Sequence, residues 1–400
     1  MARFAKNDIM SVIAQEPRHD LGESLGPDLR VGELLDASGL NELALSYGTV
    51  AGDVTLRRAI ADHHSAREDD VVVTVGAMHA LFLIAFVLCD RGDEAVVTAP
   101  LFPLARTALE AVGARLRTLP LSFDRRYQPD LADLLPLLTP RTRLVSLASP
   151  QNPSGIAIPA ATLRAIIDLM EEHCPDAYLL VDETYRAAVY GNDAVADSAV
   201  GHSRKIISTG SLSKSHGAPG LRLGWAITRA PALRAQLMAA KFSTVLSCSR
   251  IDETLGLKVL EQSGRIIGER RRHLASGLET VAGWIGRNAE CVEWHRPDAG
   301  ALCAVRLKRA VFDDAAVDRF HEELERQGVK VTLGSWFGDE ARVFRLGFGL
   351  LSPTDLDVAL AALSLALGRT VCGNHVVPAA DEGPDDPLAR RAEALNCHPQ

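Results

Sequence analysis

Lys214 lies in a run of small hydroxyl side chains and glycines, SLSKSHGAPGLRLGW, at residues 211–225. The lysine stands between Ser213 and Ser215, and Arg222 follows in the same run. A lysine amine whose pKa is lowered can bond covalently to an aldehyde, while hydroxyl groups and a guanidinium are donors suited to a phosphate group. The run therefore predicts a lysine that binds an aldehyde cofactor carrying a phosphate. A solvated loop lysine is the alternative for any lysine taken alone.

Asp182 and Tyr185 follow the apolar run of residues 177–181, which is typical of a strand buried on both faces. Open α/β sheets bind ligands at the carboxyl ends of their strands, so Asp182 is expected at a ligand site. A carboxylate there keeps the ring nitrogen of a cofactor protonated, and the Tyr185 hydroxyl can reach the same ligand. An aspartate that caps a helix is the alternative interpretation.

A phosphate site is predicted where the strand expected over residues 71–75 gives way to a helix. Free backbone N–H groups at such a helix start bind anions. The alternative for Gly76 is a plain strand–helix turn. For Arg222 it is a surface ion pair, which is disfavoured because an arginine at the start of an apolar strand needs a buried partner. The residues expected around the phosphate are Gly76, Ala77, Met78, Ser211, Ser213 and Arg222.

Three more residues stand out by their surroundings. Asn152 lies in the turn-forming sequence NPSG after a predicted strand, and a simple turn is its alternative. Phe102 lies in PLFP, where its ring could stack on a cofactor or pack in the core. Arg345 is the one charge in the apolar run VFRLG and needs a carboxylate partner. An internal salt bridge with Asp339 or Glu340 is the alternative there.

The elements that must position these residues alternate in type from residue 45 to about residue 280. Short β-branched runs alternate with amphipathic stretches, which predicts an α/β domain with a mainly parallel sheet. We expect helices over about 230–264 and 265–287, and an α+β domain with strands at 302–307 and 343–347 and a helix at 317–327. The sequence predicts a large domain over residues 45–285 and a small domain over residues 286–370. Residues 1–44 are expected to pack with the small domain, and residues 371–400 are expected to form a loosely ordered tail. Strands are expected at 71–75, 94–98, 115–119, 143–147, 177–181, 205–209 and 223–227.

Composition limits the function classes. The chain has 400 residues, 47% of them hydrophobic, and a formal net charge of −8, which favours a folded protein with no nucleic-acid surface. Its seven cysteines are scattered without a C-x-x-C pair, so neither a metal site nor a disulfide framework is expected, and a reducing cytoplasm is the predicted location. The longest apolar run, residues 81–89, is too short to span a membrane.

Taken in order, these motifs resemble fold-type-I pyridoxal-phosphate enzymes, which share the aspartate-aminotransferase fold. The resemblance covers residues 45 to about 350 and implies that Lys214 forms a Schiff base with the cofactor. It also implies a homodimer in which the Tyr47 hydroxyl reaches the phosphate of the neighbouring subunit, although a turn before a helix explains Tyr47 equally well. The resemblance also implies Asp182 at the pyridine nitrogen, and Tyr185 and Asn152 at the 3-oxygen. Phe102 would stack on one face of the ring, and Ala187 or a nearby small residue would cover the other. Arg345, with Asn152, would bind the substrate α-carboxylate.

The resemblance implies a class I/II aminotransferase that moves the α-amino group of an L-amino acid to a 2-oxo acid. The segments 32–35, 210–225 and 344–348 are also similar to capreomycidine-synthase-like enzymes, which act on arginine derivatives by elimination and ring closure in secondary metabolism. A regulator that binds the cofactor without turnover is a third alternative, disfavoured because the residues before Tyr47 are few and not basic. No second arginine clearly demands a dicarboxylate substrate. Arg186, Arg250 and residues 243–249 are candidates to line the substrate pocket, and His216 is expected to be a loop histidine.

Overall fold

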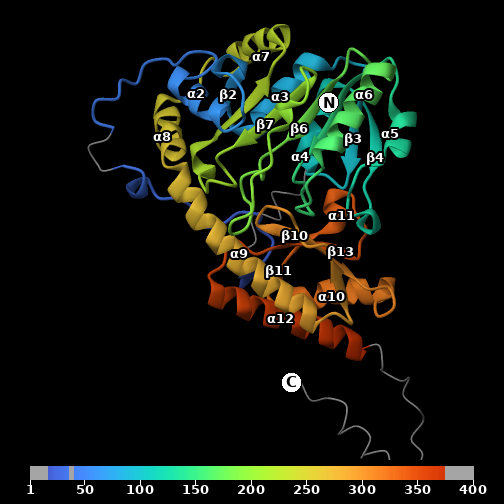
Figure 1. The fold of residues 1–400 in the computed structure, drawn as a ribbon. Helices are drawn as coiled ribbons and strands as arrows, with labels where there is room; N and C mark the ends of the chain where they lie inside the picture. Colours follow the sequence, from blue (N-terminus) through green and yellow to red (C-terminus); the bar gives the residue numbers. More distant parts are fainter. Residues whose placement is uncertain (1–16, 36–39, 374–400) are drawn as a thin grey trace, which may run out of the picture.

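The computed structural model describes residues 17–35 and 40–373, which form a large unit and a smaller one joined by a long helix (Figure 1). A seven-stranded sheet in the order β2-β8-β7-β6-β5-β3-β4 forms the centre of the large unit. Its strands are β2 (Val71–Val75), β3 (Glu94–Ala99), β4 (Arg115–Pro120), β5 (Thr142–Ala148), β6 (Tyr178–Asp182), β7 (Ile206–Ser211) and β8 (Leu223–Thr228).

The sheet is parallel from β4 to β7, whereas β8 runs antiparallel to both β7 and β2. A parallel neighbour needs a crossover of a dozen or more residues, usually a helix. Residues 212–222, between β7 and β8, hold only a short 3-10 turn at Pro219–Leu221, so the chain reverses direction there. That reversal places the loop containing Lys214 at the end of β7.

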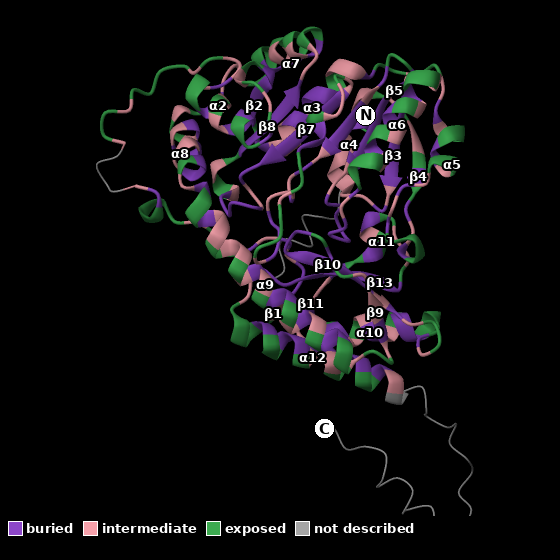
Figure 2. Cartoon of the chain, in the orientation of Figure 1, coloured by how far each residue is buried: buried purple, intermediate pink, exposed green. Residues whose placement is uncertain are grey.

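Helices cover both faces of this sheet because successive side chains of a strand point to opposite sides. Leu179 and Leu180 of β6, for example, belong to different hydrophobic cores. The strands are mostly buried, apart from the edge strand β4, and the outward faces of the helices are exposed (Figure 2). One core packs against α3 (Gly76–Leu88), α4 (Pro103–Val112) and α7 (Pro231–Thr244). The cores on the other face include α2 (Val54–Asp62), α5 (Leu131–Leu134), α6 (Ala160–His173) and α8 (Arg250–Glu261).

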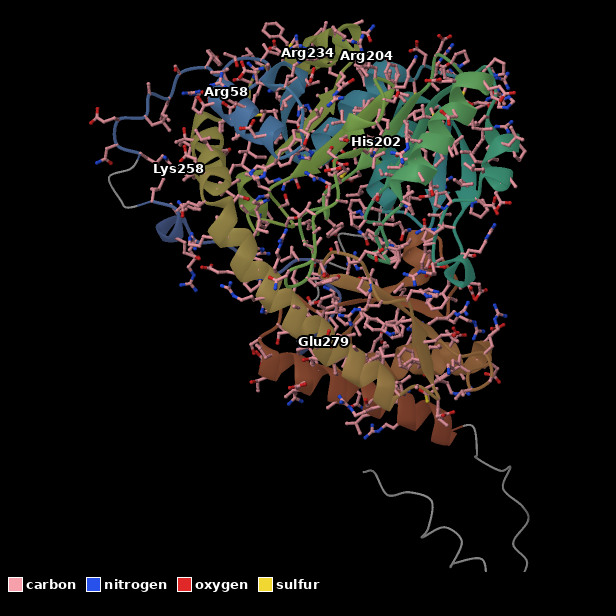
Figure 3. All side chains as sticks on the ribbon, in the orientation of Figure 1. Arg58, His202, Arg204, Arg234, Lys258 and Glu279 are labelled. Atoms are coloured by element: carbon pink, nitrogen blue, oxygen red, sulfur yellow. The ribbon has the colours of Figure 1, made fainter. Side chains whose placement is uncertain are left out.

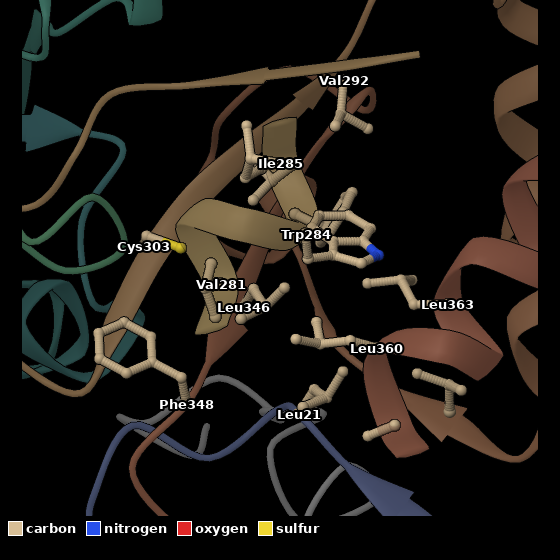
Figure 4. Packing of buried hydrophobic residues seen from close by; sticks show 14 of the residues in the cluster. Leu21, Val281, Trp284, Ile285, Val292, Cys303, Leu346, Phe348, Leu360 and Leu363 are labelled. Atoms are coloured by element: carbon tan, nitrogen blue, oxygen red, sulfur yellow. The ribbon is translucent and has the colours of Figure 1, made fainter. Parts of the chain in front are cut away.

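The helix α9 (Ser263–Arg287) runs from the large unit into the smaller one. There its residues Val281 and Trp284 pack against Leu346 and Leu360 in a separate core (Figure 4). The small unit holds the sheet β12-β13-β10-β9 and two more long helices. Its elements are β9 (Val292–Trp294), β10 (Leu302–Leu307), α10 (Asp314–Gln327), β11 (Val329–Lys330), β12 (Thr332–Leu333), α11 (Gly334–Phe337), β13 (Val343–Gly347) and α12 (Pro353–Gly373).

The N-terminal segment contacts both units. Its strand β1 (His19–Asp20) pairs with β11, and Leu21 lies in the core of the small unit. Leu34 instead packs in a core of the large unit, with Trp225. The division into domains at residues 45, 286 and 371 remains a prediction. Residues 374–400 of the predicted tail lie outside the described residues, while residues 371–373 continue α12.

Two helix boundaries differ from those expected from the sequence. The helical stretch expected over 230–264 is two helices, α7 and α8, because residues 245–249 leave the helix and Leu246 takes a left-handed backbone conformation. The helix expected from residue 317 begins at Asp314, where the Asp313 side chain accepts a hydrogen bond from the Ala316 N–H. Among the helices of residues 17–35 and 40–373, none is both long and apolar enough to cross a membrane.

Candidate functional site

A cavity of about 240 Å³ lies at the carboxyl ends of β5, β6 and β7. Ala148, Asp182 and Ser211, the last residues of these three strands, all line it. Polar groups at neighbouring strand ends meet there because carboxyl ends of parallel strands share one edge of a sheet. The predicted site residues that line it are Ala77, Met78, Phe102, Asn152, Asp182, Tyr185, Ser211, Ser213, Lys214 and Arg222.

Lys214 follows β7 on a turn and reaches into this cavity. Its Nζ donates a hydrogen bond to Ser24 Oγ at 3.3 Å, and Ser24 Oγ lies 2.9 Å from the Tyr185 hydroxyl. No acidic side chain in the described part of the chain forms an ion pair with Lys214. The amine is therefore held by a neutral hydroxyl and stays available for a covalent bond.

Asp182 is the buried acid of the site. Its Oδ1 accepts hydrogen bonds from the Thr184 N–H at 3.0 Å and from Thr184 Oγ1 at 2.6 Å. Burial raises the pKa of Asp182 above its usual range, and no described cation pairs with it. A buried carboxylate without a cation is unfavourable, so a cationic group bound in the cavity would stabilise it. No helix follows Asp182, which excludes the helix-cap alternative.

The start of α3 and Arg222 meet on another wall of the cavity. Gly76 has a φ of +72°, and a Cβ placed on it would lie 2.5 Å from Arg222 Nη2. The guanidinium therefore lies directly over the start of α3, where backbone N–H groups are free. The sequence-based argument that Arg222 is buried is wrong: the residue is exposed and directly precedes β8, and its Nη1 donates to the Pro219 carbonyl at 2.9 Å. An exposed guanidinium remains free to bind a phosphate.

Arg345 on β13 is buried beside the cavity, and its Nη1 donates to Asn152 Oδ1 at 3.1 Å. Its Nη2 donates to the Gly22 carbonyl and to Thr332 Oγ1, while its Nε has no partner among the described residues. The proposed salt bridge with Asp339 or Glu340 is absent from the described residues. Asp339 instead accepts a hydrogen bond from Tyr127, and Glu340 pairs with Arg309. Burial lowers the pKa of Arg345, and the nearby acids Glu23 and Asp20 oppose this shift only in part. Neither acid forms an ion pair with the guanidinium among the described residues.

The remaining candidates differ in position. Phe102 lines the cavity and packs edge-on against Trp336, with ring centroids 6.0 Å apart. Tyr47 lies outside the cavity, with 86% of its surface exposed. Arg186 and Ala187 line a different cavity, and Arg250 pairs with Asp53 at 3.2 Å. Within a single chain, the cavity that contains Lys214 is therefore not lined by Tyr47, Arg186, Ala187 or Arg250.

Sequence reasoning did not single out several residues of the cavity. Thr184 could have been found, since it lies between Asp182 and Tyr185 in the same motif. Ser24 could not, because it is distant in the sequence and lies in no recognisable pattern. The cavity-lining residues that were missed are Ser24, Leu81, Ala148, Pro150, Thr184 and Pro219.

The residues present fit pyridoxal phosphate on chemical grounds. The group needs an amine, an acid for its ring nitrogen and anion donors for its phosphate. Lys214 has no acidic partner and Asp182 is buried without a cation, so each lacks the kind of group that the cofactor would supply. Arg222 and the start of α3 offer the anion donors, and only a glycine at position 76 leaves space for both.

Comparison with known proteins gives a consistent result. The family model for class I and II aminotransferases matches residues 22–363. The chain is 31% identical to capreomycidine synthase of Streptomyces vinaceus over 86% of each chain. It is also 31% identical to the arginine–pyruvate transaminase of Pseudomonas aeruginosa, over 74% of this chain and 75% of that one.

Solved structures show the same fold. The PLP-dependent cyclase OrfR superimposes with a TM-score of 0.79 and 27% identity, over 90% of this chain and 95% of that one. A Thermus thermophilus aspartate aminotransferase superimposes with a TM-score of 0.80 and 22% identity, over 92% and 99%. The predicted aspartate-aminotransferase-like α/β fold is thereby confirmed.

Proposed function

Because the chain belongs to the class I and II aminotransferase family, its cofactor is pyridoxal phosphate, and we propose that it moves the α-amino group of an L-amino acid to a 2-oxo acid. Lys214 is proposed to bind the cofactor covalently. Once a substrate amine had replaced it on the cofactor, the Lys214 amine would be free to act on the substrate.

Each residue of the site has a proposed task. Bound pyridoxal phosphate supplies an electron sink for the α-carbon of the substrate. Lys214 would take the α-proton of the substrate as general base and would then donate a proton to the cofactor carbon that carries the amino nitrogen. The Asp182 carboxylate would hold a proton on the ring nitrogen, and the Tyr185 hydroxyl would donate to the cofactor's 3-oxygen. The guanidinium of Arg345 binds the substrate α-carboxylate in a two-pronged geometry.

One observation carries this proposal: an unpaired amine and an unpaired buried acid lie in one cavity, beside a buried arginine that has no acidic partner among the described residues. Burying Arg345 without an anion is costly. The α-carboxylate of an amino acid would supply that anion. An amino acid substrate therefore satisfies the buried guanidinium.

The test uses the purified holoenzyme with L-amino acids and either 2-oxoglutarate or pyruvate. We expect glutamate or alanine to form, and L-arginine is the first amino donor to try because a relative is named an arginine–pyruvate transaminase. Replacing Lys214 by Ala should reduce turnover by about 10³-fold or more, since it removes the general base. Undiminished turnover in that variant would refute the assignment.

A second candidate function is elimination and ring closure on an arginine-derived amino acid. The similarity to capreomycidine synthase and to a PLP-dependent cyclase favours it. Lys214, Asp182 and Arg345 would serve both reactions, because both begin with removal of the α-proton. The two are separated by the products: consumption of the amino acid with no amino group found on any added 2-oxo acid supports cyclisation and contradicts amino transfer.

We also propose that the active enzyme is a homodimer. Tyr47 is an almost fully exposed ring that contacts no part of the site in its own chain. Exposed apolar side chains also lie on α3 (Phe86), α7 (Phe242) and α8 (Ile251), and a partner subunit could cover them. Light scattering should give twice the mass of one chain, and Tyr47→Ala should weaken cofactor retention without changing the fold. A monomer with full activity would contradict the proposal.

A further inference from the structure

A second cavity, of about 500 Å³, lies behind the cofactor site. It is formed by the end of α2, the loop after β6, the turn after Lys214, and the starting half of α9. Thr184 and Ser211 line both cavities, so a thin wall separates them. None of the reaction steps above uses this second cavity.

Several polar groups that line it lack partners among the described residues. His216 is 7% exposed, and its Nδ1 has no hydrogen bond, while its Nε2 lies 3.4 Å from Ser263 Oγ. Burial lowers the pKa of His216 to about 3, so the ring is neutral. Trp225 is 5% exposed, and its indole N–H also has no acceptor. Buried polar groups are nearly always paired, so these two indicate a missing ligand or water.

Arg271 on α9 is the charged group of the cavity. Some arginines on the outer surface pair with acids: Arg58 lies 2.7 Å from Glu68, and Arg234 lies 3.8 Å from Asp69 (Figure 3). Arg271 is half-buried, its Nε is fully buried without an acceptor, and no described acid pairs with it. A guanidinium in this setting favours an oxyanion.

Two glycines form part of the wall that α9 gives to the cavity. Gly264 and Gly268 line the cavity with Arg271, and a Cβ added to either glycine would meet no atom within 4 Å. Glycine inside a helix is less stable than alanine, so packing among the described residues gives no reason for either glycine. The two glycines keep the cavity open on the side next to Arg271.

The other charges of the cavity leave Arg271 as its free cation within the described chain. Glu183 is buried and accepts hydrogen bonds from Ser198 Oγ at 2.7 Å and from the Ala199 N–H at 2.6 Å. It also lies 3.5 Å from Arg186 Nε, so its charge is already balanced. The acids Asp62 and Asp197 are exposed, and solvent screens them.

We propose that this cavity is a second ligand site, which binds a small molecule through a carboxylate or phosphate oxyanion held by Arg271, with His216 and Trp225 as further hydrogen-bond partners. This second site is separate from the proposed cofactor and substrate positions, and ligand binding there would be additional to the proposed amino transfer. It lies next to them, since Ser215 donates to the Thr184 carbonyl at 3.1 Å and precedes His216.

The experiment is calorimetric titration of the holoenzyme with inorganic phosphate and, separately, with succinate. The two probes distinguish phosphate from carboxylate ligands. Gly268→Leu fills the cavity, and Arg271→Gln removes its cation. We expect each variant to weaken binding of the preferred probe by about tenfold or more, as for the loss of a charged hydrogen bond.

Gly286→Leu is the matched control, because Gly286 also lies on α9 with open space around it but does not line the cavity. It should bind the probe like the wild type. Wild-type affinity in both Gly268→Leu and Arg271→Gln, or no binding of either probe to the wild-type holoenzyme, would overturn the proposal. So would a crystal structure with a partner subunit's side chain filling the cavity. Since binding is read by heat, a failure of amino transfer in the same preparation bears on the proposed function alone.

Discussion

At the scale of single residues, Ser24 joins parts of the site that come from distant segments. Its buried hydroxyl contacts both Lys214 Nζ and the Tyr185 hydroxyl. Two residues before it, the Gly22 carbonyl accepts a hydrogen bond from Arg345. One short segment thus contacts both the amine proposed to act as general base and the arginine proposed to bind the substrate.

We expect Ser24→Ala to lower kcat by about tenfold or less, because it removes one ordinary hydrogen bond of about 1 kcal/mol from the Lys214 amine. KM should change little, since Ser24 does not bind the substrate carboxylate in the proposed arrangement. The pH dependence of the cofactor's visible absorption should also shift, and Ser24→Thr, which keeps the hydroxyl, should restore it. An unchanged absorption titration in Ser24→Ala would show that Ser24 only fills space.

Residues that share a short motif were predictable, and residues that meet only through the fold were not. Lys214 with its serines and Asp182 with Tyr185 stand close together in the sequence, so local pattern was enough to group them. Ser24 comes to the site through pairing of β1 with β11, a contact between distant segments that local pattern does not reveal. The exposure of Arg222 was misjudged because it lies one residue before the strand rather than inside it.

At the scale of elements, the junction of β2 and α3 is the proposed phosphate site. Gly76→Ala should weaken cofactor retention, because a Cβ would displace the Arg222 guanidinium and strain a backbone with φ of +72°. The strain should cost about 1–2 kcal/mol, equivalent to roughly tenfold in cofactor affinity. Dialysis followed by absorption spectroscopy measures how much cofactor each protein retains.

Gly286→Ala on α9 is the control, because its Cβ would meet open space. That variant should keep the cofactor as the wild type does and be slightly more stable, since alanine favours a helix interior. Equal cofactor loss in both variants would indicate a general effect of glycine replacement rather than a phosphate site at α3.

Strand positions were predicted closely, while strand direction at β8 was not. Runs of β-branched residues between turns predicted β2, β10 and β13 with their observed bounds. The direction of β8 depends on the length and content of residues 212–222, which hold no helix to carry the chain back. The length of residues 212–222 could have predicted the reversal, because eleven residues without a helix are too few to bring the chain back for a parallel strand.

At the scale of the whole molecule, the large unit, the small unit and the N-terminal segment all contribute to one site. Arg345 comes from the small unit, Lys214 and Asp182 from the large one, and Ser24 from the segment that contacts both. α9 connects the two units and also forms the wall of the second cavity. Movement of the small unit would therefore move the proposed carboxylate site relative to Lys214.

The burial of His216 links the stability of the whole fold to pH. Burial lowers the pKa of His216 from 6.5 to about 3, so the unfolded chain binds a proton near pH 6.5 while the folded protein does not. The free energy of unfolding is therefore fully retained above pH 6.5 and falls as the pH drops toward 3. Well below pH 6.5 the loss approaches about 1.4 kcal/mol per pH unit. His64, whose pKa is also lowered by burial, adds to the same trend.

His216→Asn removes this titration while keeping a polar side chain. Urea unfolding of the wild type and the variant between about pH 7 and pH 5 should show a shallower loss of stability in the variant, by about 1 kcal/mol per pH unit. That window lies above the range in which buried carboxylates such as Glu183, whose pKa is lowered, begin to lose their contribution. Equal slopes in the two proteins would mean that the folded state protonates His216 as readily as the unfolded chain does, and its burial would then place no limit on acid stability.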